Sequence, residues 1–261
     1  MISSPRSPRV RAVAQLKQRT ARSQTGLFVL EGPQALRDAL AAGAAIDEVF
    51  FTASGVERHP DLIERSDAPT TEVSDEALAR MADTSSPQGF VAAARQFPRR
   101  LDDALEGAAR VVILHEISDP GNLGTVIRVA DAAGFDAVIV TEGSVDVYNP
   151  KVVRATTGSL FHVPHAVGVT TEEAVAAVRK RGFSVLAADV GGDDLRPGAQ
   201  ELRQPHAWLF GNEARGLNAA VLALADHSLR VPIMGRAESL NLGTAAAVCL
   251  YASAFAADSA L

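Results

Sequence analysis

Short apolar runs alternate with helix-like periodicity along residues 110–210, and this alternation is the clearest pattern in the chain. Pro120 opens a helix that ends at Gly134, and the capping pair Thr170 and Glu173 opens another that ends at Gly182. Strands that alternate with helices predict a mostly parallel sheet covered on both faces. The apolar runs predict four strands, at Val111–Leu114, Ala137–Val140, Phe183–Ala188 and Ala207–Phe210.

The first hundred residues carry a second, smaller α/β pattern. Pro at the start and Gly just past the end mark one of its helices, and Ser74 is a suitable N-cap for another. The predicted elements are a helix over Pro33–Ala42 before Gly43, a strand over Ile46–Phe51, a helix from Ser74 through Ala82, and a strand over Gly89–Ala94. The fold class is therefore α/β, in two parts.

Turn-forming residues divide the chain near residues 97–109, and a length of 261 residues fits two modest domains. We expect a domain over residues 1–97, a linker over 98–109 and a second domain over 110–261. The Ala-rich stretch Thr244–Ala257 predicts a buried helix, since a bilayer span needs about 20 apolar residues. The polar N-terminus has no apolar run of the kind found in signal peptides. We expect no membrane partner.

The composition, with 47% hydrophobic and 21% charged residues, is that of a folded globular protein. The single Cys249 excludes a disulfide framework and a multi-cysteine metal site, and it fits a cytoplasmic location. No second His follows His115-Glu116 at the metalloprotease spacing, so we expect the six histidines to be structural or exposed. No metal is expected.

The formal net charge of −6 hides an asymmetry. Residues 1–25 sum to +6 and contain no acid, whereas the other 236 residues sum to −12. A basic arm on an acidic body can steer a polyanion to one end of the molecule, and the alternative is a merely solvated terminus. The basic residues of the arm are Arg6, Arg9, Arg11, Lys17, Arg19 and Arg22.

Several common sequence signatures are missing. No G-x-G-x-x-G follows a strand, which weakens any assignment to a dinucleotide-binding fold. No phosphate-binding G-x-x-x-x-G-K-[ST] motif and no G-x-S-x-G nucleophile elbow occur. Chemistry is therefore sought in the loops at the carboxyl ends of the predicted strands, where ligands of parallel sheets bind.

Three such loops have unusual sequences, which are His115–Arg128, Leu209–Leu217 and Val231–Ala247. The glycines at 211 and 216 permit close approach by a ligand or by another chain segment. Asn122 and Arg128 are six residues apart, or about 600° around a helix. If both serve one site, we expect Asn122 in the loop before the helix and Arg128 on the helix.

Together the three loops resemble the signature motifs of the SpoU (TrmH) family of RNA ribose 2′-O-methyltransferases, in the SPOUT class. The segment from Asn149 to His162 is also similar to a family segment. The likeness to the catalytic domain spans about residues 110–258. Residues 1–95 resemble the small α/β substrate-binding domain of the ribosomal-protein L30e type.

The resemblance implies methyl transfer from S-adenosylmethionine to a ribose 2′-hydroxyl, and a catalytic domain whose C-terminal segment forms a trefoil knot. It makes Arg128 the catalytic arginine and a homodimer the expected assembly. The residues that it places around the reacting groups are Asn122, Glu213, Ser239 and Asn241. The residues that it assigns to the cofactor are Leu209, Gly211, Val231, Ile233 and Leu240.

One position departs from the family pattern. Members often have glycine where this chain has Ala214, and a positive φ there would strain alanine by roughly 1–2 kcal/mol. Guanidinium is not normally deprotonated in proteins, so our hypothesis for Arg128 is a phosphate clamp, where accounts of the family describe a general base.

The basic arm and the separate first domain favour a structured RNA, and the resemblance points to 23S-type ribosomal RNA. A tRNA substrate is the first alternative. A non-catalytic RNA-binding or ribosome-assembly factor of the same fold is the second, and a small-molecule enzyme is more distant.

Overall fold

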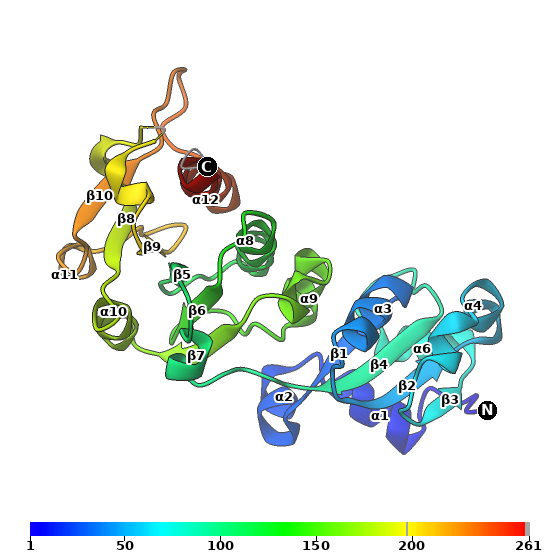
Figure 1. Ribbon diagram of the computed structural model, residues 1–261. Helices are drawn as coiled ribbons and strands as arrows, with labels where there is room; N and C mark the ends of the chain where they lie inside the picture. The colour runs from blue at the N-terminus through cyan, green and yellow to red at the C-terminus, as the bar shows by residue number, and fades with distance from the viewer. Residues whose placement is uncertain (197, 259–261) are drawn as a thin grey trace. The chain divides into compact units, whose positions relative to one another are not determined.

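The computed structural model describes residues 1–196 and 198–258, and its contacts divide the chain into two compact units (Figure 1). Unit 1 contains Met1–Phe97 together with Tyr148–His162. Unit 2 contains Pro98–Val147 and the chain from Val163 onward. We call Tyr148–His162 the returning segment, because it interrupts unit 2 and returns to unit 1.

The returning segment corrects one boundary of the expected domain organisation. The sequence analysis assigned residues 110–261 to a single domain, yet residues 148–162 pack with the first hundred residues. Tyr148, Val152 and Leu160 are fully or almost fully buried in this segment. These apolar side chains take their cover from unit 1, which periodicity along the chain does not reveal.

Unit 1 is built on a four-stranded sheet in the order β1-β4-β2-β3. β4 is antiparallel to β1 and β2, and β2 is parallel to β3. The strands are β1 (Leu27–Glu31), β2 (Ile46–Phe51), β3 (Thr70–Glu72) and β4 (Phe90–Arg95). The helices are α1 (Pro8–Gln15), α2 (Arg19–Thr25), α3 (Pro33–Ala41), α4 (Ala53–Arg58), α5 (Asp61–Glu64), α6 (Asp75–Met81), α9 (Pro150–Thr156) and the short η1 (Ser159–Phe161).

The basic N-terminal region is folded and is not an arm. Pro8 stands at the first position of α1, where its missing N–H costs nothing. Val10, Val13 and Leu16 fall on one side of this region and are buried against α6. Their burial stabilises the N-terminal helix, so the alternative of a merely solvated terminus was wrong, and most of the basic residues lie on folded helices.

Unit 2 contains a six-stranded, fully parallel sheet in the order β10-β8-β9-β5-β6-β7. The strands are β5 (Arg110–Leu114), β6 (Ala137–Thr141), β7 (His165–Val169), β8 (Ser184–Asp194), β9 (His206–Phe210) and β10 (His227–Arg230). The helices are α7 (Leu101–Ala104), α8 (Pro120–Ala132), α10 (Thr171–Arg179), α11 (Ala219–Leu222), α12 (Leu242–Asp258) and the short η2 (Gln200–Leu202). The parallel sheet agrees with the sequence analysis.

Alternate residues of the central strands face opposite layers of unit 2. Ile113, Val185 and Leu209 join one core cluster with residues of α10 and α11. On the other face, the indole N–H of Trp208 donates to Ser253 of α12. Figure 1 shows α8 and α12 on this face and α10 and α11 on the opposite one. Both faces are therefore covered, as the apolar strands predicted.

Most predicted elements are confirmed within a residue or two. The capping box of Thr170 and Glu173 is complete at the start of α10, and Ser74 accepts the Ala77 N–H at the start of α6. Gly43 follows α3 with φ +68°. β8 was underestimated, because it continues to Asp194 and its last residues pair with β10. Within residues 1–196 and 198–258, none of the helices is both long and apolar enough for a bilayer span.

Candidate functional site

Two of the three motif loops meet because their strands are neighbours in the parallel sheet. β5 and β9 pair in register, with Leu114 opposite Phe210 at their carboxyl ends. The Glu213 carboxylate, which follows β9, accepts hydrogen bonds from the Ser118 N–H at 3.1 Å, the Ser118 hydroxyl at 2.8 Å and the Asp119 N–H at 3.1 Å. It also accepts from Nδ2 of Asn122 at 3.2 Å. One carboxylate therefore orders the loop that opens α8.

These hydrogen bonds keep Glu213 ionised. Burial alone would raise the pKa of the carboxyl, but the hydrogen bonds from the backbone and hydroxyl of Ser118 and from Asn122 outweigh it, so the pKa lies below its usual value. The site thus holds a fixed negative charge at neutral pH.

The third motif loop joins the same network through Asn241. Nδ2 of Asn241 donates to Oδ1 of Asn122 at 2.9 Å. Oδ1 of Asn241 accepts the N–H of Gly243 at 2.9 Å and thereby caps the first turn of α12. Glu213, Asn122 and Asn241 form a relay across all three loops, which we call the motif network.

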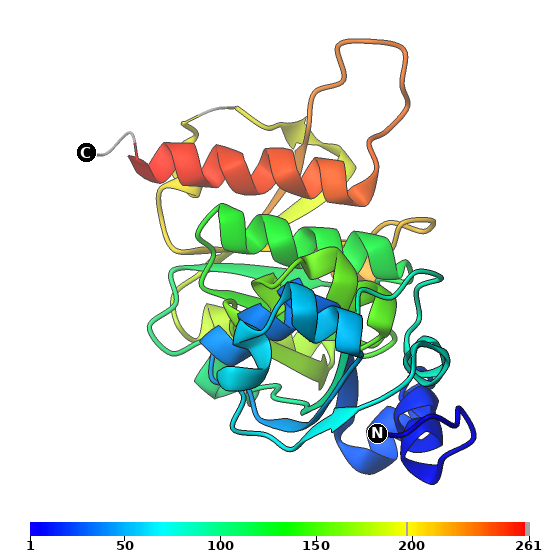
Figure 2. The ribbon, with the colours of Figure 1, turned by 90° about the vertical axis from the view of Figure 1, so that its right-hand side faces the viewer.

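The start of α12 lies directly on α8, as Figure 2 shows for the two helices. A Cβ atom at Gly243 would lie 2.8 Å from Cγ2 of Thr125, which is closer than real contacts allow. Glycine at 243 therefore allows the two helices to approach closely without displacing the Thr125 side chain.

Asn122 lies in the first turn of α8, which begins at Pro120, so the expected position in the preceding loop was wrong. Asp119 caps α8 by accepting the Asn122 N–H at 2.8 Å. Arg128, on the same helix, is exposed and makes no hydrogen bond or ion pair to any described residue. Ser239 is likewise exposed and outside the motif network. The structure brings Asn122, Glu213 and Asn241 together and leaves Arg128 and Ser239 open to solvent.

The loop after β9 is closed by its own backbone. A Cβ atom at Gly211 would lie 2.5 Å from the carbonyl carbon of Gly216, so glycine at 211 serves the turn itself. Among the described residues other than glycine, positive φ is confined to Glu116 and Thr157. Ala214 therefore has an ordinary backbone conformation, and its substitution for glycine causes no strain.

The residues assigned to the cofactor fit an adenosyl group in part through side chains and in part through backbone. Leu209 is fully buried in the core, so only its backbone could face a ligand. Val231, Ile233 and Leu240 are partly or well exposed on the loop between β10 and α12, which projects from the unit in Figure 2. The backbone N–H and C=O groups of residues 231–240 make no hydrogen bond within the part of the chain that the structure describes. Apolar side chains beside unused backbone groups suit an adenine ring.

The basic residues of the first helices divide into two groups. Arg22 is buried and donates to the carbonyl oxygens of Leu16 and Lys17 at 2.8 and 2.9 Å, so it supports the turn before α2 and cannot reach a phosphate in this conformation. Arg9 pairs with Glu48 and Lys17 donates to carbonyl oxygens at the end of α6. Arg6, Arg11 and Arg19 have exposed side chains.

Two residues of the loops escaped the sequence analysis. Ser118 gives Glu213 two of its hydrogen bonds. Asn212 donates to the Glu116 carbonyl at 2.7 Å and accepts the N–H groups of Ala214 and Arg215. The available signal was their position in the first motif loops, beside residues that were selected.

The SpoU rRNA Methylase family matches residues 109–251, which is more than half of the chain. The chain belongs to the SpoU family. The MRM3-like substrate binding domain matches residues 7–92, within unit 1.

Three relatives match this chain nearly from end to end. The 23S rRNA (guanosine(2553)-2′-O)-methyltransferase RlmP of Bacillus subtilis is 34% identical over 254 residues, which covers 96% of this chain and 97% of the relative. The crystal structure of AdoMet-bound rRNA methyltransferase from Sinorhizobium meliloti has a TM-score of 0.84 and 31% identity, with 97% and 96% of the two chains covered. The SpoU methyltransferase AviRb of Streptomyces viridochromogenes, in complex with AdoMet, has a TM-score of 0.86 and 27% identity over 95% and 97%.

Proposed function

We propose that this protein transfers a methyl group from S-adenosylmethionine to a ribose 2′-hydroxyl of large-subunit ribosomal RNA. The observation that carries the proposal is the motif network, in which Glu213, Asn122 and Asn241 join all three SpoU loops at one edge of the sheet. The relative RlmP, whose name states this activity on 23S rRNA, aligns with both units of the chain. A tRNA substrate is less well supported, because the match includes the whole substrate-binding unit.

The chemistry requires alignment of a hydroxyl with a methyl donor and a path for one proton. When bound, S-adenosylmethionine supplies an electrophilic methyl group. Val231, Ile233 and Leu240 would hold its apolar parts, and the unused backbone groups of residues 231–240 and the backbone of Leu209 and Gly211 would hold its polar edge. The motif network keeps the start of α8 and the start of α12 in one geometry while the substrate binds.

Arg128 acts on the RNA in this proposal. Its exposed guanidinium has no partner among the described residues and is free to clamp the phosphate next to the target ribose in a bidentate manner. Asn122 lies in the first turn of the same helix, and Glu213 accepts a hydrogen bond from it. Ser239 supplies a hydroxyl from the third loop.

Substitution of Arg128 by lysine tests the clamp. We expect turnover to fall while the pH–rate profile keeps its shape, because lysine retains the charge and loses the planar fork. Full activity with an unchanged profile in Arg128→Lys would contradict bidentate clamping.

The RNA contacts in unit 1 narrow to three exposed arginines. A triple variant with Arg6, Arg11 and Arg19 changed to Gln should bind RNA more weakly and with a shallower salt dependence. With fewer phosphate contacts, fewer counterions are released from the RNA on binding. Arg65→Gln, at an exposed arginine elsewhere in unit 1, is the control. An unchanged salt slope in the triple variant would show that these residues do not contact RNA.

The decisive experiment maps 2′-O-methylation across total RNA incubated with the protein and S-adenosylmethionine. Methylation of one 23S rRNA nucleotide is the expected result. Methylation of tRNA would favour the first alternative. Calorimetry that detects no S-adenosylmethionine binding would favour the non-catalytic RNA-binding factor.

We further infer a homodimer. The support is an apolar stripe on α12, where Val248, Tyr251 and Phe255 are 41%, 37% and 65% exposed at helical spacing. A two-fold contact would cover the stripe on both copies. Sedimentation of the wild type against Phe255→Glu tests this assembly, and a monomeric wild type would exclude it.

We also infer that the C-terminal segment forms a trefoil knot and that the protein is cytoplasmic. The chain leaves the edge strand β10, passes through the 231–241 loop and reaches α12, which packs on α8 and β9 in the interior of the sheet. This return toward the middle of the sheet is consistent with threading. Cys249 is buried, which raises its thiol pKa to about 12, and a single inert thiol suits a reducing compartment.

A further inference from the structure

The chain passes between the two units three times, at residues 97/98, 147/148 and 162/163. On the unit 1 side, the residues at these crossings contact one another. Phe97 stacks on Phe161 at 5.5 Å between ring centroids and meets the edge of Tyr148 at 5.8 Å. The Phe97 N–H also donates to the Tyr148 hydroxyl at 2.8 Å. All three crossings therefore leave unit 1 from one aromatic cluster.

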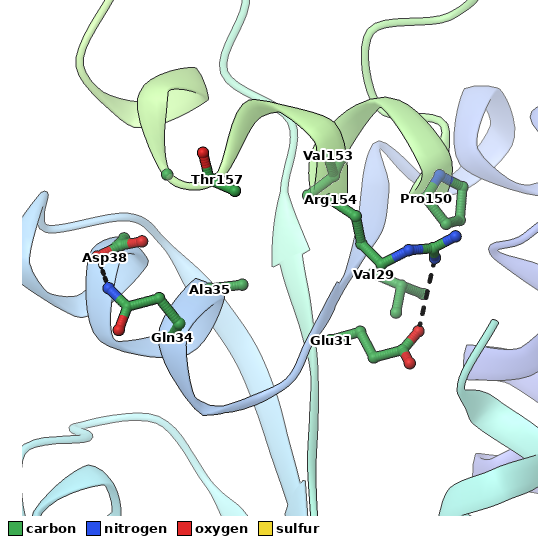
Figure 3. A pocket seen from close by; sticks show the side chains of 10 residues that line it. Val29, Glu31, Gln34, Ala35, Asp38, Pro150, Val153, Arg154 and Thr157 are labelled. Atoms are coloured by element: carbon green, nitrogen blue, oxygen red, sulfur yellow. Dashed lines mark hydrogen bonds and ion pairs between the residues drawn. The ribbon is translucent and has the colours of Figure 1, made fainter. Parts of the chain in front are cut away.

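Arg154 fixes the returning segment within unit 1. Its Nη2 lies 2.9 Å from a carboxylate oxygen of Asp83. Its Nη1 lies 3.8 Å from Glu31, as Figure 3 shows. The Glu31 side chain is only 6% exposed and also accepts the N–H groups of Asp83 and Thr84. A largely buried carboxylate makes this ion pair less screened by solvent than an exposed one.

The packing beside this ion pair is incomplete. A cavity of about 200 Å³ separates α9 from α3, and Val29, Ala35 and Val153 supply apolar walls (Figure 3). At the far end of α9, a Cβ atom at Gly158 would lie 2.4 Å from Oδ2 of Asp38. Val152 and Val153 are buried on the packed side of α9, and beside the cavity its position depends on the Arg154 ion pairs and on the close approach at Gly158.

In unit 2, the chain just before the returning segment touches the first motif loop. The Val145 N–H donates to the Ile117 carbonyl at 2.7 Å, and the Ser144 hydroxyl accepts the Ile117 N–H at 3.0 Å. Ile117 is followed by Ser118, whose N–H and hydroxyl donate to the Glu213 carboxylate. Only two residues, Asp146 and Val147, separate Val145 from Tyr148.

We propose that Arg154 is a positioning residue for RNA methylation, which acts by fixing the returning segment and with it the chain that supports the first motif loop. This inference rests on the proposed function. RNA held on unit 1 reaches the site at an effective concentration that depends on how firmly the connections are held. Loosening α9 would leave both binding steps intact and lower turnover, since small misplacements of reacting groups cost large factors in rate.

The test compares Arg154→Met and Arg154→Lys with wild type in three measurements, which are S-adenosylmethionine affinity, rRNA affinity and single-turnover methylation. We expect Arg154→Met to lower turnover roughly tenfold to a hundredfold, with both affinities within about twofold of wild type. Arg154→Lys should recover a large part of the rate. Arg179→Met is the matched control, because Arg179 forms a similar ion pair with Asp226 at 2.8 Å in unit 2.

Gly158→Ala keeps the proposal falsifiable if Arg154→Met fails to fold. It displaces α9 from Asp38 without changing a charge, and we expect the same loss of turnover. Gly43→Ala is its control, because Gly43 also has positive φ but has nothing within 4 Å of the added methyl group.

Three results would overturn the inference. Unchanged turnover in Arg154→Met and Gly158→Ala would do so, and so would a parallel loss of stability and of both affinities that lysine does not rescue. A wild type that binds S-adenosylmethionine and rRNA but methylates nothing would remove the proposed function first, and this inference with it.

Discussion

Glu31 in unit 1 and Glu213 in unit 2 use the same local device for different ends. Each carboxylate accepts the N–H groups of two consecutive residues together with a hydroxyl from one of them, Thr84 for Glu31 and Ser118 for Glu213. They differ in the last partner, which is the cation Arg154 for Glu31 and the neutral amide of Asn122 for Glu213.

The difference indicates what each carboxylate is for. The cation of Arg154 lies between the nearly buried Glu31 and Asp83 and partly compensates their charges, which makes the group a structural joint. A neutral amide leaves the negative charge of Glu213 uncompensated at the edge of the sheet where ligands of parallel sheets bind. The same hydrogen-bonding pattern therefore supports packing in one unit and the motif network in the other.

Glu213→Gln should have the largest effect. The glutamine amide would place an N–H against one of the donors of Ser118 or Asp119, and the motif network would lose its order. We expect turnover to fall about a hundredfold, with unit 1 unaffected. Methylation kinetics and hydrogen exchange of residues 115–122 measure this, and a variant with full activity would show that Glu213 only supports the fold.

Acid should destabilise unit 2 before unit 1, because the buried histidines with lowered pKa lie in unit 2. Burial lowers the pKa of His165 to about 4 and also lowers that of His206. The unfolded chain binds a proton near pH 6.5 that folded His165 refuses, so stability is lost as pH falls from about 6.5 to about 4.

The loss attributable to His165 amounts to about 3 kcal/mol. Chemical denaturation from pH 8 to pH 4, with hydrogen exchange to assign the regions, checks it. Earlier opening of unit 1 would contradict this assignment, and His165→Gln should flatten the profile.

Glu31→Gln should lower the stability of unit 1 by about 2 kcal/mol, because backbone donors of Asp83 and Thr84 would then face a partly donating group. S-adenosylmethionine affinity should not change. Denaturant unfolding and calorimetry distinguish the two readouts. An effect on cofactor binding as strong as that of Glu213→Gln would remove the contrast between the two carboxylates.

Arg215→Ala should have the smallest effect. Arg215 pairs with Glu116 at 2.7 Å, but its side chain is 71% exposed, so the pair contributes less than about 1 kcal/mol. Thermal denaturation of Arg215→Ala and wild type checks this prediction. A large shift of the melting temperature would show that the loops depend on this ion pair as well as on Glu213.

Much of unit 2 could be predicted from the sequence, because its strands are continuous apolar runs and its helices begin at recognisable capping residues. Thr170 and Glu173 form the predicted capping box, and the predicted helix from Pro120 is α8. Asn122, Glu213 and Asn241 were selected from the loops, and Asn122 does hydrogen-bond to both of the others. Their meeting follows from the parallel strands that carry them.

The remainder depends on contacts between residues distant in the chain. The six basic residues before residue 25 suggested an arm, yet Val10 and Val13 provide an apolar side that the charge pattern obscured. The return of residues 148–162 to unit 1 depends on Arg154 meeting Glu31 and Asp83, which nothing local to α9 indicates. The open position of Arg128 was also not predictable from its spacing.

The interleaving of the units has a consequence for how this protein can be divided and recombined. A fragment that starts at Pro98 would carry Tyr148, Val152 and Leu160 without the surface that covers them, and would expose apolar side chains that promote aggregation. A fragment that ends at Phe97 would lose Arg154, the cation that pairs with Glu31 and Asp83. The two units are thus not interchangeable modules, and any exchange of substrate-binding units between relatives would have to carry residues 148–162 along with residues 1–97.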